Sequence, residues 1–221
     1  MREIVDYAAD RFITVIPESE MPGHSEEVFV AYPQFSCSGR PYIDSDYCVG
    51  NDDTFIFLED VLSEVIELFP SQYIHIGGDE AGKTSWKTCP KCRERMHRED
   101  LKDVDELQAY FMKRMINFVE SKDRKAIGWD EILEGGLQSD AVVMAWRSEE
   151  QALKAIQQGN KVIMTPASHC YFDYYQSDPA TEPEAIGGYI LLRKVYAFEP
   201  LLQDSLSSYI LGAQAHLWTE Y

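Results

Sequence analysis

Short apolar runs alternate with helical patterns along most of this sequence, and that alternation constrains the fold more than any other feature. The runs at residues 73–76 and 141–146 contain few polar residues, which is typical of strands buried on both faces. Such a chain is predicted to form an α/β fold in which helices cover a parallel sheet. Six strands are expected, at residues 12–16, 73–76, 125–129, 141–146, 161–165 and 210–218.

Helical patterns lie between these runs. Along residues 54–69 the apolar side chains recur at spacings of three and four, and residues 51–53 offer capping side chains. Helices are therefore expected at residues 1–10, 54–69, 107–119 and 149–158, with long loops at 17–53 and 166–190. Because no linker or repeat interrupts the pattern, residues 1–221 are expected to form a single domain.

The kind of α/β fold follows from what the sequence lacks. No Gly-x-Gly-x-x-Gly loop follows the first expected strand, which disfavours a dinucleotide-binding fold. A TIM-type (β/α)8 barrel requires eight strands. The sequence therefore predicts a barrel of this type that is incomplete, with two strands missing.

The chain is strongly acidic, with a formal net charge of −18 and a pI near 4.6. Nucleic acids and anionic membrane surfaces are disfavoured as partners, because both bind basic surfaces. No apolar run approaches the ~20 residues that a membrane span requires. A neutral substrate is compatible with this composition.

The five cysteines suggest local pairing. Cys37 and Cys48 lie in an irregular stretch, where a disulfide would staple the loop. Cys89 and Cys92 have the spacing of zinc ligands, but no second pair with this spacing completes a set of four. They are therefore expected to form a local disulfide or to remain as two thiols, and Cys170 is expected to pack as a small apolar residue.

Acidic and aromatic residues follow the carboxyl ends of the expected strands. The strand at 73–76 leads through two glycines into adjacent carboxylates, Asp79 and Glu80. In a parallel α/β barrel all these strand ends open on one face, which carries the active site. The other polar and aromatic residues at strand ends are Glu18, Glu20, His24, Trp129, Asp130, Glu131, Trp146, Arg147, His169, Tyr171, Asp173, Trp218 and Glu220.

This composition points to a sugar site. One tryptophan would be read as a core residue, but three of the four stand at strand ends beside an acid or Arg. Aromatic rings stack on the C–H faces of sugars, and carboxylates accept hydrogen bonds from their hydroxyls. Most glycosidases place two carboxylates about 5 Å or more apart across the scissile bond. Because Asp79 and Glu80 are adjacent, they favour substrate-assisted chemistry, in which one carboxyl moves protons and the other orients the substrate's own nucleophile.

Six motifs in this order resemble those of glycoside hydrolase family 20, the β-N-acetylhexosaminidases, and the resemblance is greatest to the secreted bacterial members. They span nearly the whole chain. They are Met21-Pro22-Gly23-His24, His75-x-Gly77-Gly78-Asp79-Glu80, Gly128-Trp129-Asp130-Glu131, Ala145-Trp146-Arg147, Tyr171-x-Asp173-x-x-Gln176 and Leu217-Trp218-Thr219-Glu220.

The resemblance implies a role for each site residue. Glu80 would be the general acid and then the base, Asp79 would hold the 2-acetamido N–H, and Tyr171 would donate to the acetamido oxygen. The remaining implied contacts are a sugar-binding wall of Trp129, Trp146 and Trp218, outer-hydroxyl contacts from Asp173 and Glu220, and His24 beside Glu80. His75 would support the strand end from inside. No cofactor and no metal are implied.

Two departures from the family pattern stand out. Glu20 occupies a position where the family has Asp, which would shift the surroundings of His24 by a methylene. The chain also matches the family only from the helix before barrel strand three to strand eight. The first two strands, and the Arg that binds the sugar's 3- and 4-hydroxyls, are thus expected to be missing.

The leading hypothesis is a retaining exo-β-N-acetylhexosaminidase that acts on terminal β-linked N-acetylglucosamine or N-acetylgalactosamine of a glycan or chito-oligosaccharide. The alternative is a carbohydrate-binding remnant of the same scaffold with weak or no turnover. A family 18 chitinase is disfavoured because its Asp-x-x-Asp-x-Asp-x-Glu spacing is absent, and a metal hydrolase because the histidines are scattered. A periplasmic or secreted location is expected, and a homo-oligomer is compatible with the sequence.

Overall fold

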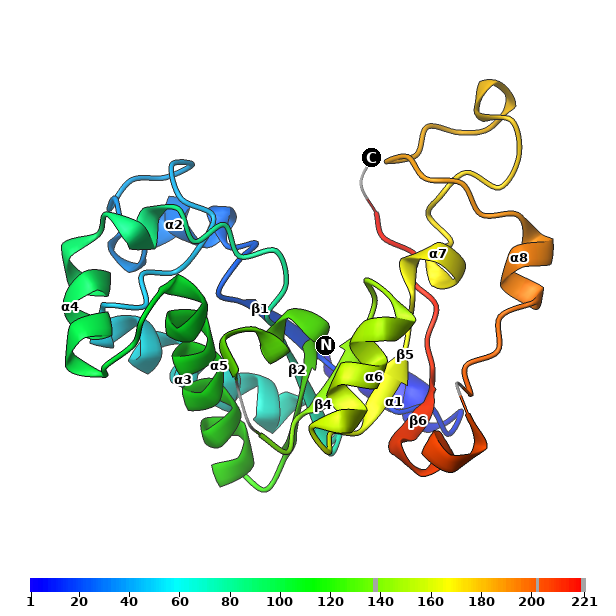
Figure 1. Ribbon diagram of the computed structural model, residues 1–221, viewed down its shortest axis with the longest axis horizontal. Helices are drawn as coiled ribbons and strands as arrows, with labels where there is room; N and C mark the ends of the chain where they lie inside the picture. Colours follow the sequence, from blue (N-terminus) through cyan, green and yellow to red (C-terminus); the bar gives the residue numbers. More distant parts are fainter. Residues whose placement is uncertain (137–138, 202, 220–221) are drawn as a thin grey trace. The chain divides into compact units, whose positions relative to one another are not determined.

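The computed structural model describes residues 1–136, 139–201 and 203–219. The chain packs as two compact units, an N-terminal unit of residues Met1–Ala141 and a C-terminal unit of residues Val142–Tyr221 (Figure 1). The expected single domain over residues 1–221 stays a prediction.

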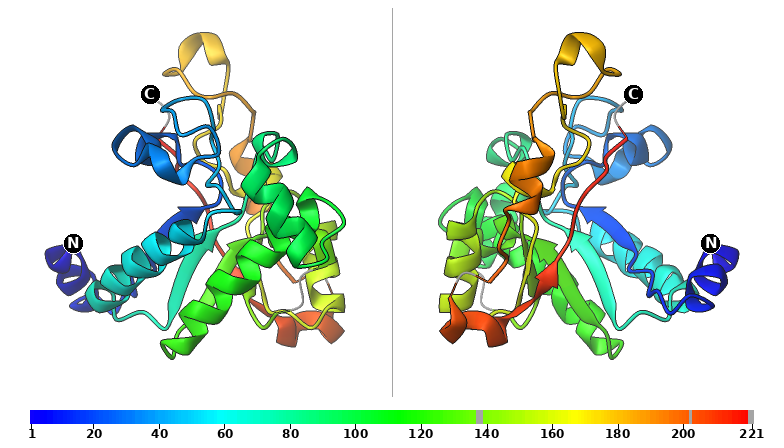
Figure 2. Two further views of the ribbon diagram at one scale, coloured as in Figure 1. Left: turned by 90° about the vertical axis from the view of Figure 1, so that its left-hand side faces the viewer. Right: turned by 90° about the vertical axis from the view of Figure 1, so that its right-hand side faces the viewer.

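The N-terminal unit is built on three parallel strands, β1 (Glu18–Met21), β2 (Tyr73–Gly77) and β3 (Lys125–Trp129). Helix α5 (Val104–Ser121) packs on β2 and β3, and α3 (Asp52–Leu68) packs against α5 (Figure 2). Both helices begin at a side-chain cap: Asn51 accepts from an N–H of α3, and Asp103 accepts from two N–H groups of α5. The predictions of β2, β3 and these two helices are confirmed.

The C-terminal unit repeats the pattern with β4 (Val142–Ala145), β5 (Val162–Met164) and β6 (Ile210–Ala213), which pair in parallel in that order. Helix α6 (Glu149–Gln157) packs on β4 and β5, as predicted. Short helices α7 (Ala167–Cys170), η4 (Pro179–Thr181), α8 (Leu192–Tyr196) and η5 (Asp204–Tyr209) lie in the long connection to β6. The last strand is shorter than the expected 210–218.

The strand expected at residues 12–16 is wrong. After α1 (Arg2–Ala9), Phe12 adopts a positive φ of 59° and is fully exposed, so the apolar run begins inside a turn. Pairing with β2 starts only where the carbonyl of Pro17 accepts the His75 N–H, at 2.9 Å. The polar segment that follows becomes β1, because a strand is defined by its partner as well as by its propensity.

Four short helical segments between residues 26 and 98 were not predicted. Two lie in the expected loop at 17–53, α2 (Glu26–Ala31) and η1 (Pro33–Phe35). The third, α4 (Pro90–Arg98), occupies the polar stretch that holds the Cys89/Cys92 pair, and η2 (Ser85–Lys87) precedes it. Proline at the first position of α4 is a helix-start signal, but the polar composition of that helix hides it.

The disulfide expected between Cys37 and Cys48 is wrong, since all five cysteines are present as thiols, and Cys89 and Cys92 take the second of their two expected states. The expectation that no second pair of cysteines completes a set of four metal ligands is wrong as well. Cys37 and Cys48 lie beside Cys89 and Cys92 and complete a group of four. Cys170 is buried, as expected.

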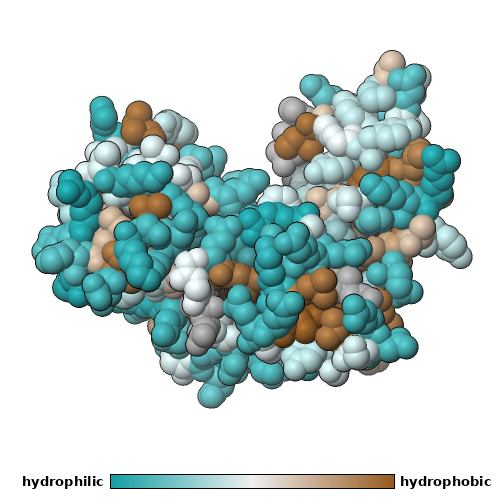
Figure 3. Space-filling view, viewed as in Figure 1, coloured by the Kyte–Doolittle hydropathy of each residue, from teal (hydrophilic) through white to brown (hydrophobic). Residues whose placement is uncertain are grey.

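The visible face of the molecule is largely hydrophilic, with scattered apolar patches (Figure 3). Among the described residues, no helix combines the length and apolar character needed to cross a membrane.

Candidate active site

Two glycines, the last residue of β2 and the residue after it, place the adjacent carboxylates at the carboxyl end of the strand. Gly77 and Gly78 have φ values of 68° and 106°, in the region that favours glycine. A Cβ at Gly77 would collide with the carboxylate of Glu20, and one at Gly78 would collide with Ile132. The chain therefore turns in a space that admits no side chain, and Asp79 follows directly.

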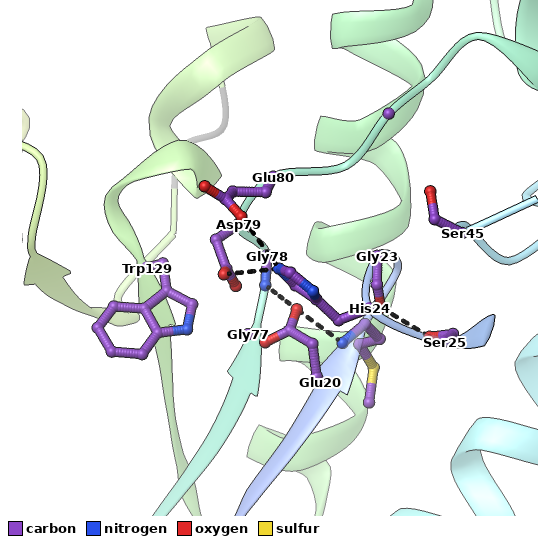
Figure 4. Close-up of polar contacts among 12 residues, drawn as sticks. Glu20, Gly23, His24, Ser25, Ser45, Gly77, Gly78, Asp79, Glu80 and Trp129 are labelled. Carbon is purple, nitrogen blue, oxygen red and sulfur yellow. Dashed lines mark hydrogen bonds and ion pairs between the residues drawn. The ribbon is translucent and has the colours of Figure 1, made fainter. Parts of the chain in front are cut away.

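His24 lies between the two carboxylates at the end of β1 (Figure 4). Its Nε2 is 3.4 Å from Asp79 Oδ2 and 3.4 Å from Glu80 Oε2. The hydrogen bond to Asp79, together with the charges of both carboxylates, raises the pKa of His24 to about 9. The ring is therefore an imidazolium at neutral pH.

The raised pKa of His24 predicts a pH-dependent contribution to stability. A group whose pKa rises on folding stabilises the native state fully below its unfolded pKa of 6.5, and that stability is lost as the pH rises through about 9. We expect His24→Gln to lower the thermal unfolding midpoint below pH 6.5 and to match wild type above pH 9. A difference that grows with pH would contradict this assignment.

Glu20 is a second carboxyl group that contacts Asp79. Its Oε1 accepts the backbone N–H of Gly78 at 2.9 Å and that of Met21 at 3.0 Å. Burial, followed by the charge of Asp79 and a hydrogen bond to it, raises the pKa of Glu20 to about 10. Glu20 is thus neutral at pH 7, and its O–H donates a hydrogen bond to Asp79.

Asp79 is the ionised member of this group. Burial alone would raise the pKa of Asp79, but hydrogen bonds from His24 and Glu20 outweigh burial and hold the pKa below its usual value. Its Oδ1 is buried and has no hydrogen-bond partner among the described residues. A buried carboxylate oxygen without a donor is costly, and here it offers an acceptor to an incoming N–H.

Glu80 differs from its neighbour in exposure. The Glu80 side chain is 57% exposed, whereas that of Asp79 is 17% exposed. Glu80 also has a positive φ of 47°, which turns the chain away from the strand direction. The two adjacent acids therefore have different surroundings, one enclosed and one open to solvent.

Trp129 is buried against residues of β1 and β2. Its ring is only 3% exposed, its Nε1–H donates to Glu18 Oε1 at 2.9 Å, and it packs on the ring of His75 with centroids 4.8 Å apart. His75 is 3% exposed, in keeping with the expected internal role. Burial raises the pKa of Glu18 despite the hydrogen bond from Trp129.

In the C-terminal unit, three of the predicted site residues form a row of aromatic rings together with His216. Trp146 stacks on Tyr171 at 6.1 Å, Tyr171 meets the ring of His216 edge-on at 4.9 Å, and His216 stacks on Trp218 at 5.4 Å. Burial lowers the pKa of His216 to about 4, so this ring is neutral and packs as an aromatic. Asp173 Oδ1 is buried without a partner among the described residues, as Asp79 Oδ1 is.

The structure thus groups the predicted residues within each unit: His24, Asp79, Glu80 and Trp129 in the first, and Trp146, Tyr171, Asp173 and Trp218 in the second. Glu220 lies outside the described residues. His169 stacks on Phe198 and takes no part in the aromatic row.

The sequence did not predict the roles of two residues, Glu20 and His216. The contact of Glu20 with Asp79 could have been sought from strand periodicity, because Glu18 and Glu20 share one face of β1. His216 could have been found in the same way, since it stands two positions before Trp218 in an extended segment.

His24, Asp79 and Glu80 could also be read as a metal set, because their ligand atoms lie within 4.8 Å of one another. A metal would have to displace the proton of His24, and the raised pKa of that ring makes this displacement less favourable at neutral pH. A proton-transfer site fits this group better than a cation site.

Comparisons with known proteins identify the family of this chain. The model of the glycosyl hydrolase family 20 catalytic domain matches residues 1–221. A β-hexosaminidase of Porphyromonas gingivalis is 50% identical over the whole chain, which covers 30% of that protein. The crystal structure of a β-N-acetylhexosaminidase from Bacteroides fragilis aligns with a TM-score of 0.84 at 37% identity, over 98% of this chain and 45% of that one.

A third relative carries a bound sugar. The exo-β-N-acetylglucosaminidase of Vibrio harveyi, solved in complex with N-acetylglucosamine, aligns with a TM-score of 0.87 at 30% identity over 98% of this chain and 36% of that one. This chain spans less than half the length of each of these three relatives. The predicted α/β fold of the TIM-barrel type is confirmed, and the chain belongs to glycosyl hydrolase family 20, a family of glycoside hydrolases.

Proposed function

We propose that this chain carries the catalytic carboxylates of a retaining exo-β-N-acetylhexosaminidase that removes terminal β-linked N-acetylglucosamine or N-acetylgalactosamine from glycans. The observation that carries the proposal is the state of Asp79, which is ionised, enclosed and left with one buried oxygen lacking a donor. The N–H of a 2-acetamido group is a donor of the right kind for that oxygen. Family membership and the sugar-bound relative support the same substrate class.

In the first step the acetamido oxygen attacks the anomeric carbon while the bond to the leaving oxygen breaks. Glu80, the exposed carboxyl group, gives its proton to that leaving oxygen. Asp79 holds the acetamido N–H and stabilises the positive charge of the oxazolinium ring, because a fixed carboxylate in a partly enclosed site opposes that charge strongly.

In the second step water opens the ring. Glu80 takes a proton from the water, which attacks the anomeric carbon from the face that the leaving group vacated. The acetamido group is restored, and two inversions give net retention. A neutral Glu20 serves this scheme, because a second anion beside Asp79 would raise the pKa of Asp79 and favour its protonation.

The residues of the C-terminal unit are proposed to bind the sugar. Tyr171 would donate to the acetamido oxygen, and the aromatic row of Trp146, Tyr171, His216 and Trp218 would contact apolar parts of the sugar. Asp173 offers an unpaired oxygen for a sugar hydroxyl. These roles are supported by family membership and by the order in which the four aromatic rings contact one another.

Substrate choice tests the proposal directly. The purified full-length protein should hydrolyse nitrophenyl β-N-acetylglucosaminide and leave the matched β-glucoside intact, because the glucoside has no internal nucleophile. A thiazoline analogue of the oxazoline intermediate should inhibit competitively and bind more tightly than N-acetylglucosamine. Comparable rates on both glycosides would exclude the substrate-assisted route, and sugar binding without turnover would favour the carbohydrate-binding alternative.

A further inference from the structure

Four of the five cysteines meet at one point of the N-terminal unit, in a group separate from that of His24, Asp79 and Glu80. Cys37 and Cys48 come from the connection between η1 and α3, whereas Cys89 and Cys92 flank the start of α4. Their four sulfur atoms lie within 4.8 Å of one another. Three of the four residues are buried, and Cys37 is half-buried. The cluster thus joins two segments that are about forty residues apart in sequence.

The sulfur separations match metal coordination and not disulfide bonding. Three of the six sulfur–sulfur distances are 3.6 Å, between Cys37 and Cys92, and 3.8 Å, from Cys48 to both Cys89 and Cys92. A disulfide would require about 2.05 Å. A tetrahedron of sulfurs around zinc, with Zn–S bonds of ~2.3 Å, has edges of about 3.8 Å. We propose that these four cysteines bind one structural zinc ion as thiolates.

The backbone around the four sulfur atoms suits a site for a metal ion. The N–H of Gly50 points at Cys92 Sγ, at 3.4 Å, as amide donors do toward metal-bound thiolates. A Cβ at Gly50 would collide with the backbone of Lys91 and Cys92, so only glycine lets the loop approach the Cys-x-x-Cys turn this closely.

The chemistry of this donor set excludes most other common metals. Four thiolates in tetrahedral arrangement select zinc or iron, and hard cations such as Mg²⁺ and Ca²⁺ are excluded by the lack of oxygen ligands. Four protein ligands leave no position for water or substrate, which defines a structural zinc site and not a catalytic one.

The proposed zinc would hold the loop that supports the active site. Just before Cys48, the carboxylate of Asp46 accepts the N–H groups of Gly82 and Lys83, at 3.0 and 2.7 Å, directly after the catalytic pair. Tyr47 N–H donates to the carbonyl of Pro22 at 2.9 Å, and Ser25 N–H donates to that of Ser45 at 3.1 Å, on either side of His24. A metal ion bound by the four cysteines would therefore fix the segment from Ser45 to Cys48. That segment contacts the turn around His24 and the turn that follows Glu80.

Metal analysis of the purified full-length protein tests the proposal without reference to activity. Protein purified in reducing buffer should contain about one zinc per chain by elemental mass spectrometry, and zinc should be released when the thiols are modified. Cys48→Ser and Cys89→Ser should each lose most of the bound zinc. Cys170→Ser, a buried cysteine outside the cluster, is the matched control and should keep it.

Three results would overturn the assignment. The first is a native protein of mass four hydrogens lower than its sequence predicts, with two disulfides among these cysteines. The second is stoichiometric iron in place of zinc. The third is a metal-free protein whose cluster thiols all react with a thiol reagent under native conditions and whose thermal unfolding midpoint does not rise when zinc is added. Native mass spectrometry of the wild-type protein separates these outcomes even if the serine variants do not fold.

Discussion

Replacing Glu80 by glutamine should slow hydrolysis of a chito-oligosaccharide by about 10²- to 10⁴-fold, the usual contribution of a general acid–base group. Glutamine keeps the size of the side chain but cannot give a proton to the glycosidic oxygen or take one from water. Of the two adjacent carboxyl groups, Glu80 is the one that a leaving oxygen can reach, because its side chain is 57% exposed. The rate constant kcat on the oligosaccharide measures the loss.

The leaving group supplies the control for this experiment. A nitrophenyl group departs without much help from an acid, so Glu80→Gln should lose less activity on the nitrophenyl glycoside than on the oligosaccharide. An equal loss on both substrates would point to a folding or binding defect. Unchanged turnover on the oligosaccharide would show that another group is the acid.

Local sequence patterns predict the frame of the site well. The run from Tyr73 to Glu80 combines an apolar strand, two glycines and two acids, and each part depends on neighbours within a few residues. The structure places β2, the turn and the acids as that run suggests. The same holds for Trp129 at the end of β3, because strand and side-chain direction are set locally.

Features that depend on distant partners were not predictable in the same way. The strand expected at residues 12–16 has the better propensity, yet β1 forms at Glu18–Met21, where the chain finds its partner in β2. The cysteine group depends on Cys37 and Cys48 folding against a helix about forty residues later. The pairing of Glu20 with Asp79 crosses a similar distance, and only the folded structure shows that a neutral Glu20 donates a hydrogen bond to an ionised Asp79 there.

Replacing Asp79 by asparagine should lower kcat by about 10²- to 10³-fold, the range seen when one preorganised electrostatic contact to a transition state is removed. Asparagine is close to isosteric, but it carries no charge to oppose the oxazolinium ring. It can also present an NH₂ donor toward the acetamido N–H, where an acceptor is needed. The variant should bind N-acetylglucosamine with a modest change in affinity, because the charge develops only in the transition state.

Glu20→Gln is the matched control, because it removes the neighbouring carboxyl group, which is already neutral. With a pKa of about 10, Glu20 resembles glutamine at pH 7, and the glutamine NH₂ can replace its O–H as the donor to Asp79. Its loss of kcat should therefore be far smaller than that of Asp79→Asn. If both variants lost activity equally, the proton would be shared between the two groups, and Asp79 could not be the single ionised member. A large loss in Glu20→Gln alone would place the negative charge on Glu20, and Asp79 would then act as a hydrogen-bond donor instead of the anion that stabilises the intermediate.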